Sequence, residues 1–242
     1  MRKIIRGLSL LVLVVCAAVN AHAQLPAEQL FYKLRTRVTS IRDYTAPVRM
    51  NINVSFMRVP QLHGTLYFKS PNKLKLERAG GLSVLPKNGI SMSMNNLLPD
   101  GGVSVIDAGT DVIEGKPVRI IKAVPNADAS DIVLTKLWVD EARLLVLRAE
   151  TTTRDNGTVK MDLTFGRYAH LALPDRAMLH LDVKEYKMPK GVTMDYGTTE
   201  RVIEEDTKTG KTKRRRGTIR VEYLSYKVNT GLSDALFIEK KK

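Results

Sequence analysis

Cysteine is nearly absent from this 242-residue sequence, and no apolar run reaches the roughly 20 residues that a membrane-spanning helix needs. The one cysteine, Cys16, lies in an apolar stretch over residues 8–19. Basic residues precede this stretch, and the small residues Ala21 and Ala23 follow it, which is the pattern of a cleavable secretory signal peptide. We therefore expect cleavage to remove residues 1–23 and to leave residues 24–242 as a single exported domain.

Two other uses of this N-terminus remain open. The apolar stretch would be a stable membrane anchor if it were not cleaved, and Cys16 would be the lipidated residue of a lipoprotein. Val15 disfavours the lipoprotein, because lipid attachment sites usually have a small residue before the cysteine. Cleavage leaves no cysteine, so no disulfide can form and the remaining 219 residues must be stabilised by a packed core.

The sequence also lacks the residue patterns of a catalytic or metal centre. His63, His170 and His180 have no spacing that resembles a metal site, and no cysteine nucleophile survives cleavage. No serine lies in a hydrolase elbow, and no glycine-rich loop is present to cradle a phosphate. We therefore expect no catalytic residues, no metal, no cofactor and no enzyme activity.

Acidic residues are outnumbered by basic ones. The net charge of +14 falls to +11 when residues 1–23 are removed, because they contain three basic and no acidic residues. A basic surface attracts nucleic acid, an anionic membrane or an acidic partner, and it also favours solubility. Export disfavours nucleic acid, and the anionic lipids of bacterial membranes favour the membrane surface.

The charge is most concentrated in a very polar segment, residues 201–217, for which we expect a basic hairpin or loop. No aromatic residues alternate with these charges, which disfavours a stacking platform for nucleic acid. A solvated hairpin end is one interpretation, and contact with an anionic surface is the other. The candidate contact residues are Lys211, Lys213, Arg214, Arg215 and Arg216.

Hydrophobic periodicity predicts one helix followed by many strands. Over residues 26–43, Leu30, Leu34, Val38 and Ile41 recur at helical spacing, opposite a basic face. From residue 48 the period changes to two, and turn residues separate the later segments. Residues 80–107 are compatible with a weak strand, a short helix or a loop. The predicted strands are residues 48–57, 65–69, 73–78, 118–124, 131–139, 143–152, 158–168, 177–186 and 218–228.

These elements favour a mainly β structure with some helix, in the α+β class. The apolar stripe of the helix and the apolar faces of the strands must bury one another. One long, strongly curved antiparallel sheet, closed or half closed, with the helix on its concave side satisfies this requirement.

One segment resembles a known family. Residues 64–77, with the sequence GTLYFKSPNKLKLE, are similar to the core pattern of the outer-membrane lipoprotein carrier (LolA-like) family. Residues 137–140 and 229–237 agree with the family in order, so the likeness extends over most of residues 26–239. The resemblance implies a half-barrel of about eleven strands covered by the N-terminal helix and short helical segments. It also implies an apolar concavity that receives lipoprotein acyl chains for transfer across the periplasm.

Two features depart from the family pattern. Many carriers have an arginine immediately before the proline of the motif, tied to lid opening and cargo transfer, whereas this chain has Ser70 there. The polar segment at residues 201–217 is an addition to the compact pattern. The carrier mechanism therefore does not follow from the motif.

We expect a periplasmic, monomeric, non-enzymatic transfer or sorting factor that binds acyl chains, with a membrane or envelope protein as a further partner. The alternative is a regulatory or envelope-assembly module on the same fold that transfers no acyl chains. Whether the concavity is open or filled by its own side chains decides between them. The candidate lining residues, chosen by strand parity, are Leu34, Val38, Val54, Phe56, Leu66, Phe68, Leu74, Leu76, Met161 and Leu163.

Overall fold

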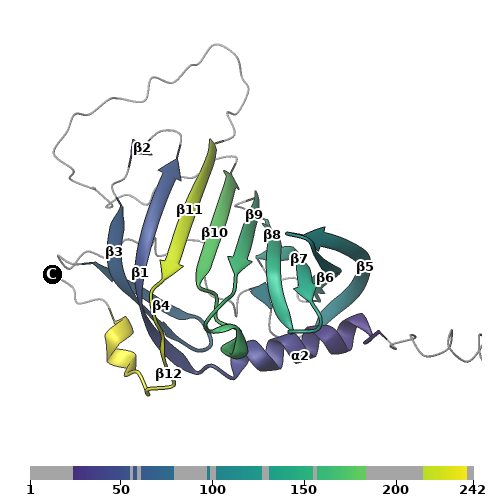
Figure 1. Cartoon of the computed structure of the whole chain (residues 1–242), viewed down its shortest axis with the longest axis horizontal. Coiled ribbons are helices and arrows are strands. Elements are labelled where there is room, and N and C mark those ends of the chain that lie inside the picture. Colours follow the sequence, from purple (N-terminus) through teal and green to yellow (C-terminus); the bar gives the residue numbers. More distant parts are fainter. Residues whose placement is uncertain are drawn as a thin grey trace, which may run out of the picture.

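The period-two segments form a single antiparallel sheet in the computed structural model (Figure 1). The structure describes residues 24–54, 57–58, 61–78, 97–98, 102–126, 131–154, 157–183 and 215–238. Within these ranges the sheet has 12 strands. The strands are β1 (Asp43–Val54), β2 (Met57–Arg58), β3 (Leu62–Lys69), β4 (Lys73–Arg78), β5 (Val103–Ile113), β6 (Lys116–Pro125), β7 (Ile132–Asp140), β8 (Leu145–Thr153), β9 (Gly157–Thr164), β10 (Arg176–Val183), β11 (Arg215–Tyr223) and β12 (Lys227–Val228).

The strand order is β4-β3-β1-β11-β10-β9-β8-β7-β6-β5, with β2 and β12 paired to β1. Strands β5 to β11 form a meander, and β11 then returns beside β1, where Val48 lies opposite Tyr223. Because β4 and β5 are the two ends of this order, the described sheet is open rather than a closed barrel. The predicted class, a curved half-barrel with a covering helix, is confirmed.

The helix α2 (Ala27–Thr39) contributes one apolar stripe to the core. Leu30, Phe31, Leu34 and Val38 are buried in the same cluster as the inward residues of the strands. Pro26 stands at the N-cap, where its missing N–H costs nothing, and Glu28 and Arg37 have the favourable charge at each end of the helix dipole.

The predicted helix over residues 26–43 was too long at its C-terminal end. The helix ends at Thr39, and Asp43 already belongs to β1, which begins five residues before the predicted start at residue 48. Tertiary contacts explain the difference. The Arg42 N–H donates to Asn229 Oδ1 and the Asn229 N–H donates to the Asp43 carbonyl, so the returning C-terminal segment draws residues 42–43 into the sheet.

The strand faces follow the predicted alternation. On β1, Val48 and Met50 are buried, and on β9 the same is true of Val159, Met161 and Leu163. Of the segment at residues 80–107, Leu97 and Leu98 are described and lie buried in the main core, and residues 103–107 belong to β5. Residues 79–96 and 99–101 lie outside the described residues.

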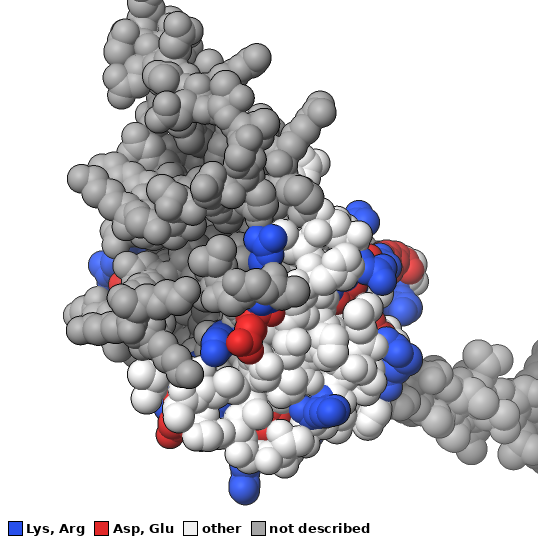
Figure 2. Space-filling model, turned by 90° about the vertical axis from the view of Figure 1, so that its left-hand side faces the viewer, with Lys and Arg blue, Asp and Glu red and all other residues white. Residues whose placement is uncertain are grey.

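The predicted basic hairpin falls mostly outside the described residues. Arg215 and Arg216 belong to β11, where they pair with Val183 and Asp182 of β10, so this strand begins three residues earlier than predicted. Lys211, Lys213 and Arg214 lie outside the described part of the chain. In Figure 2 the described basic side chains are spread over the visible face, with acidic side chains between them.

A buried carboxylate fixes the C-terminal segment. Asp43 is 4% exposed and accepts hydrogen bonds from the Thr230 N–H at 2.8 Å and the Gly231 N–H at 3.0 Å. Gly231 has φ +76°, a conformation that favours glycine. The short helical segment η3 (Asp234–Phe237) is held in addition by Lys69 and Lys73, whose ammonium groups lie 2.7 and 2.8 Å from Asp234.

We predict that Asp43→Asn lowers the free energy of unfolding at pH 7 by about 2 kcal/mol, because an amide cannot accept both backbone hydrogen bonds. Burial alone would raise the pKa of Asp43, but the hydrogen bonds from Thr230 and Gly231 outweigh it and lower the pKa below 3.8. A lowered folded-state pKa gives stability that is present above pH 3.8 and is lost as the pH falls through that pKa.

Denaturant unfolding between pH 7 and pH 2 measures both effects. Asp43→Asn should lose less stability than wild type between pH 7 and pH 2, because it lacks this carboxylate. Glu114→Gln, which removes an exposed carboxylate in the β5–β6 turn, should follow the wild-type profile. Equal stability of wild type and Asp43→Asn at pH 7 would contradict the assignment.

Candidate functional site

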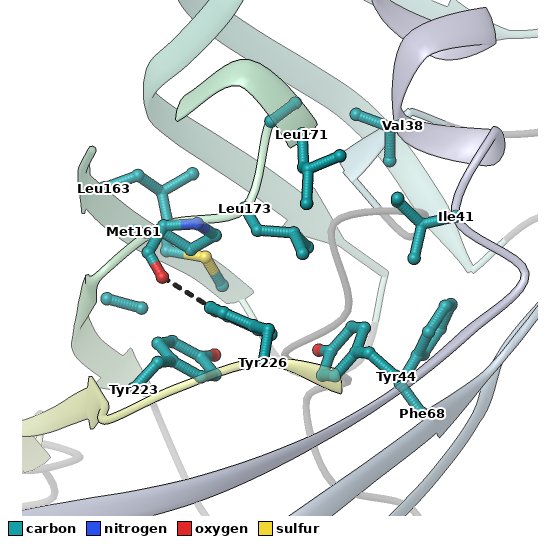
Figure 3. A pocket seen from close by; sticks show the side chains of 13 residues that line it. Val38, Ile41, Tyr44, Phe68, Met161, Leu163, Leu171, Leu173, Tyr223 and Tyr226 are labelled. Atoms are coloured by element: carbon teal, nitrogen blue, oxygen red, sulfur yellow. Dashed lines mark hydrogen bonds between the residues drawn. The ribbon is translucent and has the colours of Figure 1, made fainter. Parts of the chain in front are cut away.

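An apolar cavity lies where the end of α2 meets the concave face of the sheet (Figure 3). Its volume is about 20 Å³. It is bounded by α2, by the chain after it, by the segment around η2 (Ala169–Leu171), and by strands β1, β3, β9, β10 and β11. The lining residues are Val38, Ile41, Tyr44, Phe68, Met161, Leu163, Leu171, Ala172, Leu173, Pro174, Ala177, Tyr223 and Tyr226.

The lining has two chemically different sides. Val38, Ile41, Leu171 and Leu173 form an aliphatic wall, contributed by the end of α2 and by the η2 segment. Tyr44, Phe68, Tyr223 and Tyr226 form an aromatic wall on the sheet side (Figure 3).

The aromatic wall is held together by ring contacts. Tyr44 stacks on Phe68 with centroids 5.1 Å apart, and Tyr226 meets the edge of Tyr44 at 5.3 Å and stacks on Tyr223 at 5.3 Å. Such pairs add stability beyond the area they bury. Because Tyr44 and Tyr223 belong to paired strands, this wall keeps its place independently of α2.

The three tyrosine hydroxyls are not equivalent. Tyr226 Oη donates to the Pro174 carbonyl at 2.7 Å. Within the described residues, the hydroxyls of Tyr44 and Tyr223 have no hydrogen-bond partner, and Figure 3 shows them directed toward one another across Tyr226. Burial raises the pKa of all three phenols above the ordinary value of 10, so they are uncharged at neutral pH.

The size of the cavity bears on whether the concavity is open or filled. A cavity of about 20 Å³ has room for about one water molecule, whereas ligand pockets hold roughly 300 Å³ or more. At this place in the described part of the chain, the concavity is therefore filled by the protein's own side chains. A lipid would fit here only if the aliphatic wall moved away from the aromatic wall.

The predicted lining residues are only partly brought together at the cavity. Val38, Phe68, Met161 and Leu163 line it. Leu34, Leu66 and Leu76 are buried in the same core without lining the cavity, and Leu74 packs against that core half-buried. The side chains of Val54 and Phe56 lie outside the described part of the structure.

The three tyrosines of the cavity were not among the lining residues predicted from the sequence. Tyr44 has the inward parity of Val48 and Met50, but the strand was predicted to begin at residue 48, so Tyr44 was not considered. Tyr223 has the same parity as Val221, both of them buried, and this signal was present in the sequence. Tyr226 follows the end of β11, where strand parity gives no guidance.

The N-terminal end of α2 is fixed by a buried arginine, Arg119 of β6, which is 5% exposed. Its guanidinium donates to Glu141 at 2.9 Å, to Asp107, and to the Leu25 carbonyl just before the helix. The hydrogen bond from Arg119 lowers the pKa of Asp107. This N-terminal anchor therefore ties the start of α2 to β5, β6 and the β7–β8 turn.

The other end of the helix is fixed by Arg37, in its last turn. The Arg37 guanidinium donates to the Arg143 carbonyl, to the Ala169 carbonyl at 3.0 Å and to the His170 carbonyl at 3.2 Å. This C-terminal anchor lies beside the η2 segment. Two of its carbonyls belong to η2, so Arg37 joins the two parts of the aliphatic wall to each other, and its bond to Arg143 joins them to the β7–β8 turn.

A second hollow, of about 290 Å³, lies on the side of β8 and β9 away from the main core. Two of its charged lining residues, Arg148 and Asp162, pair with one another, and Asp162 also lies 3.0 Å from His180 Nε2. Arg143 pairs with Asp140, which lies outside the lining. Among the residues that the structure describes, no group of three or more His, Cys, Asp or Glu side chains is placed to hold a metal ion.

No family model matches the chain, and no curated protein matches it in sequence. Solved structures nevertheless share its fold. A domain described as an outer membrane lipoprotein-sorting protein domain, from Vibrio parahaemolyticus, superposes with a TM-score of 0.53 at 11% identity, over 88% of this chain and 97% of that one. A DUF1329 family protein from Desulfovibrio piger gives 0.51 at 14% identity, over 89% and 98%.

A LolA superfamily protein from Nitrosomonas europaea gives a TM-score of 0.51 at 9% identity, over 89% of this chain and 99% of that one. The chain therefore has the LolA-like fold that residues 64–77 predicted. Within the described residues, no helix combines the length and apolar character that crossing a membrane requires.

The two anchors predict separate effects on α2. Arg119→Gln should accelerate amide hydrogen exchange in the first half of the helix, because it releases Leu25 and leaves two carboxylates without their cation. It should also lower the free energy of unfolding by about 2–3 kcal/mol. Arg37→Gln should accelerate exchange in the last turn and cost about 1 kcal/mol.

Exchange measured by mass spectrometry with peptide resolution separates the two ends of the helix. Lys33→Gln removes the same charge from an exposed position of α2 and should exchange like wild type. If both arginine variants accelerated exchange uniformly along α2, the helix would be released as a unit and the two anchors would not act separately.

Proposed function

We propose that the mature protein is a periplasmic lipid- or lipoprotein-binding transfer factor that holds acyl chains between α2 and the concave face of the sheet. The observation that supports this most directly is the position of the apolar cavity, between an aromatic wall on the sheet and an aliphatic wall whose two parts, the end of α2 and η2, are joined by Arg37. The LolA-like fold and the sorting domain among its structural neighbours are consistent with this role.

The free energies of exposing the helix end and of burying an acyl chain are compatible with reversible binding. Withdrawing the end of α2 exposes Val38 and Ile41, at roughly 1.5–3 kcal/mol for each side chain. Ten methylenes of an acyl chain that replace them gain about 8 kcal/mol when they are removed from water. The surplus of about 2–5 kcal/mol corresponds to weak affinity, roughly millimolar for ten methylenes, so the cargo is readily released.

The other parts of the proposal follow from the sequence. Residues 1–23 are a signal peptide removed on export, and the mature chain is a monomer without enzyme activity. Its basic residues, Lys211 to Arg216 among them, contact an anionic membrane or an acidic envelope partner during transfer.

A second candidate function is favoured by the small volume of the cavity. A cavity of about 20 Å³ between α2 and the described part of the sheet suits a regulatory or envelope-assembly module that uses the fold as a rigid scaffold. Such a protein would bind its partner through its surface, and α2 would remain in place.

Lipid binding distinguishes the two functions. We predict that native mass spectrometry of the mature protein detects co-purified lipid, and that the delipidated protein takes up a fluorescent diacylglycerol. Arg37→Gln should accelerate uptake about tenfold, because the three hydrogen bonds that hold the end of α2 to η2 and to the β7–β8 turn are lost.

Lys33→Gln is the matched control and should take up the probe at the wild-type rate. A lipid-free mass together with no uptake by wild type or by Arg37→Gln would reject the transfer function and favour the scaffold.

A further inference from the structure

The hydroxyls of Tyr44 and Tyr223 are donors that face the cavity. Tyr44 is 7% exposed and Tyr223 is 4% exposed, and no hydrogen bond of the described residues involves either hydroxyl. Neither is an enclosed unpaired atom, since among the described side chains Asp175 Oδ1 is the one such atom, so both are open to the water-sized cavity that they line. The neighbouring Tyr226 instead donates to Pro174. Phenylalanine would fill the same space as Tyr44 or Tyr223 without presenting a donor to the cavity.

Both hydroxyls are held in place by the sheet. Tyr44 lies on β1 opposite Phe68 of β3 and Val228 of β12, and Tyr223 lies on β11 opposite Val48 of β1. The ring contacts through Tyr226 fix the angle between them. They therefore present two donors from a rigid surface, and movement of the aliphatic wall would leave their positions unchanged.

The residues around the two hydroxyls disfavour a charged ligand. The cavity is lined by apolar residues and tyrosines alone, so it offers no cation to a carboxylate or phosphate. The Asp175 carboxylate acts on Tyr226 in the direction that disfavours negative charge. A cation would have no carboxylate in the lining to pair with, and the neutral phenols can donate only to an acceptor. An uncharged acceptor attached to an apolar chain fits both sides of the cavity.

We infer that Tyr44 and Tyr223 bind the ester carbonyl of a glycerol-linked acyl chain, whose methylenes lie against the aliphatic wall. This inference rests on the proposed lipid-binding function and specifies its ligand. The site takes acylglyceryl groups in preference to free fatty acids, whose carboxylate it does not neutralise. The same acylglyceryl group occurs in membrane lipids and on the modified cysteine of a lipoprotein.

The test compares two lipids that differ only in their carbonyls. Binding of dioctanoylglycerol, a diester, and of dioctylglycerol, the matching diether, is measured by native mass spectrometry and fluorescence competition. Wild type should bind the diester about 10-fold more tightly, as expected for one or two neutral hydrogen bonds. The Tyr44→Phe/Tyr223→Phe double variant should lose this preference through weaker diester binding, with its affinity for the diether unchanged.

Stability measurements verify that the variants fold. Tyr44→Phe and Tyr223→Phe should unfold close to the wild-type temperature, because each keeps the ring and removes a hydroxyl that bonds no other described residue. Tyr226→Phe should unfold at a lower temperature, because it loses the bond to Pro174. Tyr32→Phe, at an exposed position of α2, controls for loss of a hydroxyl elsewhere and should keep the diester preference.

Failure of the carbonyl site is distinguishable from failure of lipid binding. Equal binding of diester and diether by wild type, or a preference that persists in the double variant, overturns the carbonyl site and leaves lipid binding intact. Binding of neither lipid overturns the proposed function and this inference together. Where the diester is preferred, a peptide with an S-diacylglyceryl cysteine identifies the source. Tighter binding of the peptide than of free diacylglycerol indicates a lipoprotein, and equal binding indicates a membrane lipid.

Discussion

The burial of one helical stripe in an open sheet is the constraint on which the rest of this structure depends. A twelve-stranded sheet that does not close has a concave apolar face too large to leave in water, and α2 covers part of it with Leu30, Phe31, Leu34 and Val38. Another apolar group, such as an acyl chain, can take the place of the helix on this face, because the hydrophobic effect depends on the area buried and has no preferred direction. The helix, which stabilises the fold, and a ligand therefore compete for the same concave surface.

Polar contacts at the two ends of α2 restrict how the concave face beneath the helix can be exposed. The N-terminal anchor buries Arg119 among two carboxylates and a backbone carbonyl, and separating its charges is expensive. The C-terminal anchor uses three backbone carbonyls, one of them in an exposed hydrogen bond and two in part-buried ones, and it separates no ion pair when Arg37 leaves them. The end of α2 that lies beside the cavity is thus the end that costs less to release.

Much of the fold could be predicted from the sequence because strand parity and helical spacing are local signals. The stripe from Leu30 to Val38 and the alternation on β1 and β9 are of this kind. The end of α2 was misplaced because Arg42 and Asp43 are bound by residues 229–231, nearly two hundred positions away. The site was predicted less completely, because Tyr226 and Leu171 lie in segments between strands, where the sequence shows no hydrophobic periodicity.

The residues that line the cavity indicate a narrower class of ligand than the fold alone does. An all-aliphatic lining would accept any apolar chain, and a lining with a lysine or arginine would favour fatty acids or phosphates. This lining instead combines aliphatic residues with uncharged phenols, and two of its hydroxyls are unpaired on the rigid side. In the closed core these hydroxyls face a cavity with room for about one water molecule and bond no other described residue. When the aliphatic wall has moved and an uncharged acceptor has entered, they can donate to the ligand instead, so the polar groups of the core distinguish the open state from the closed one.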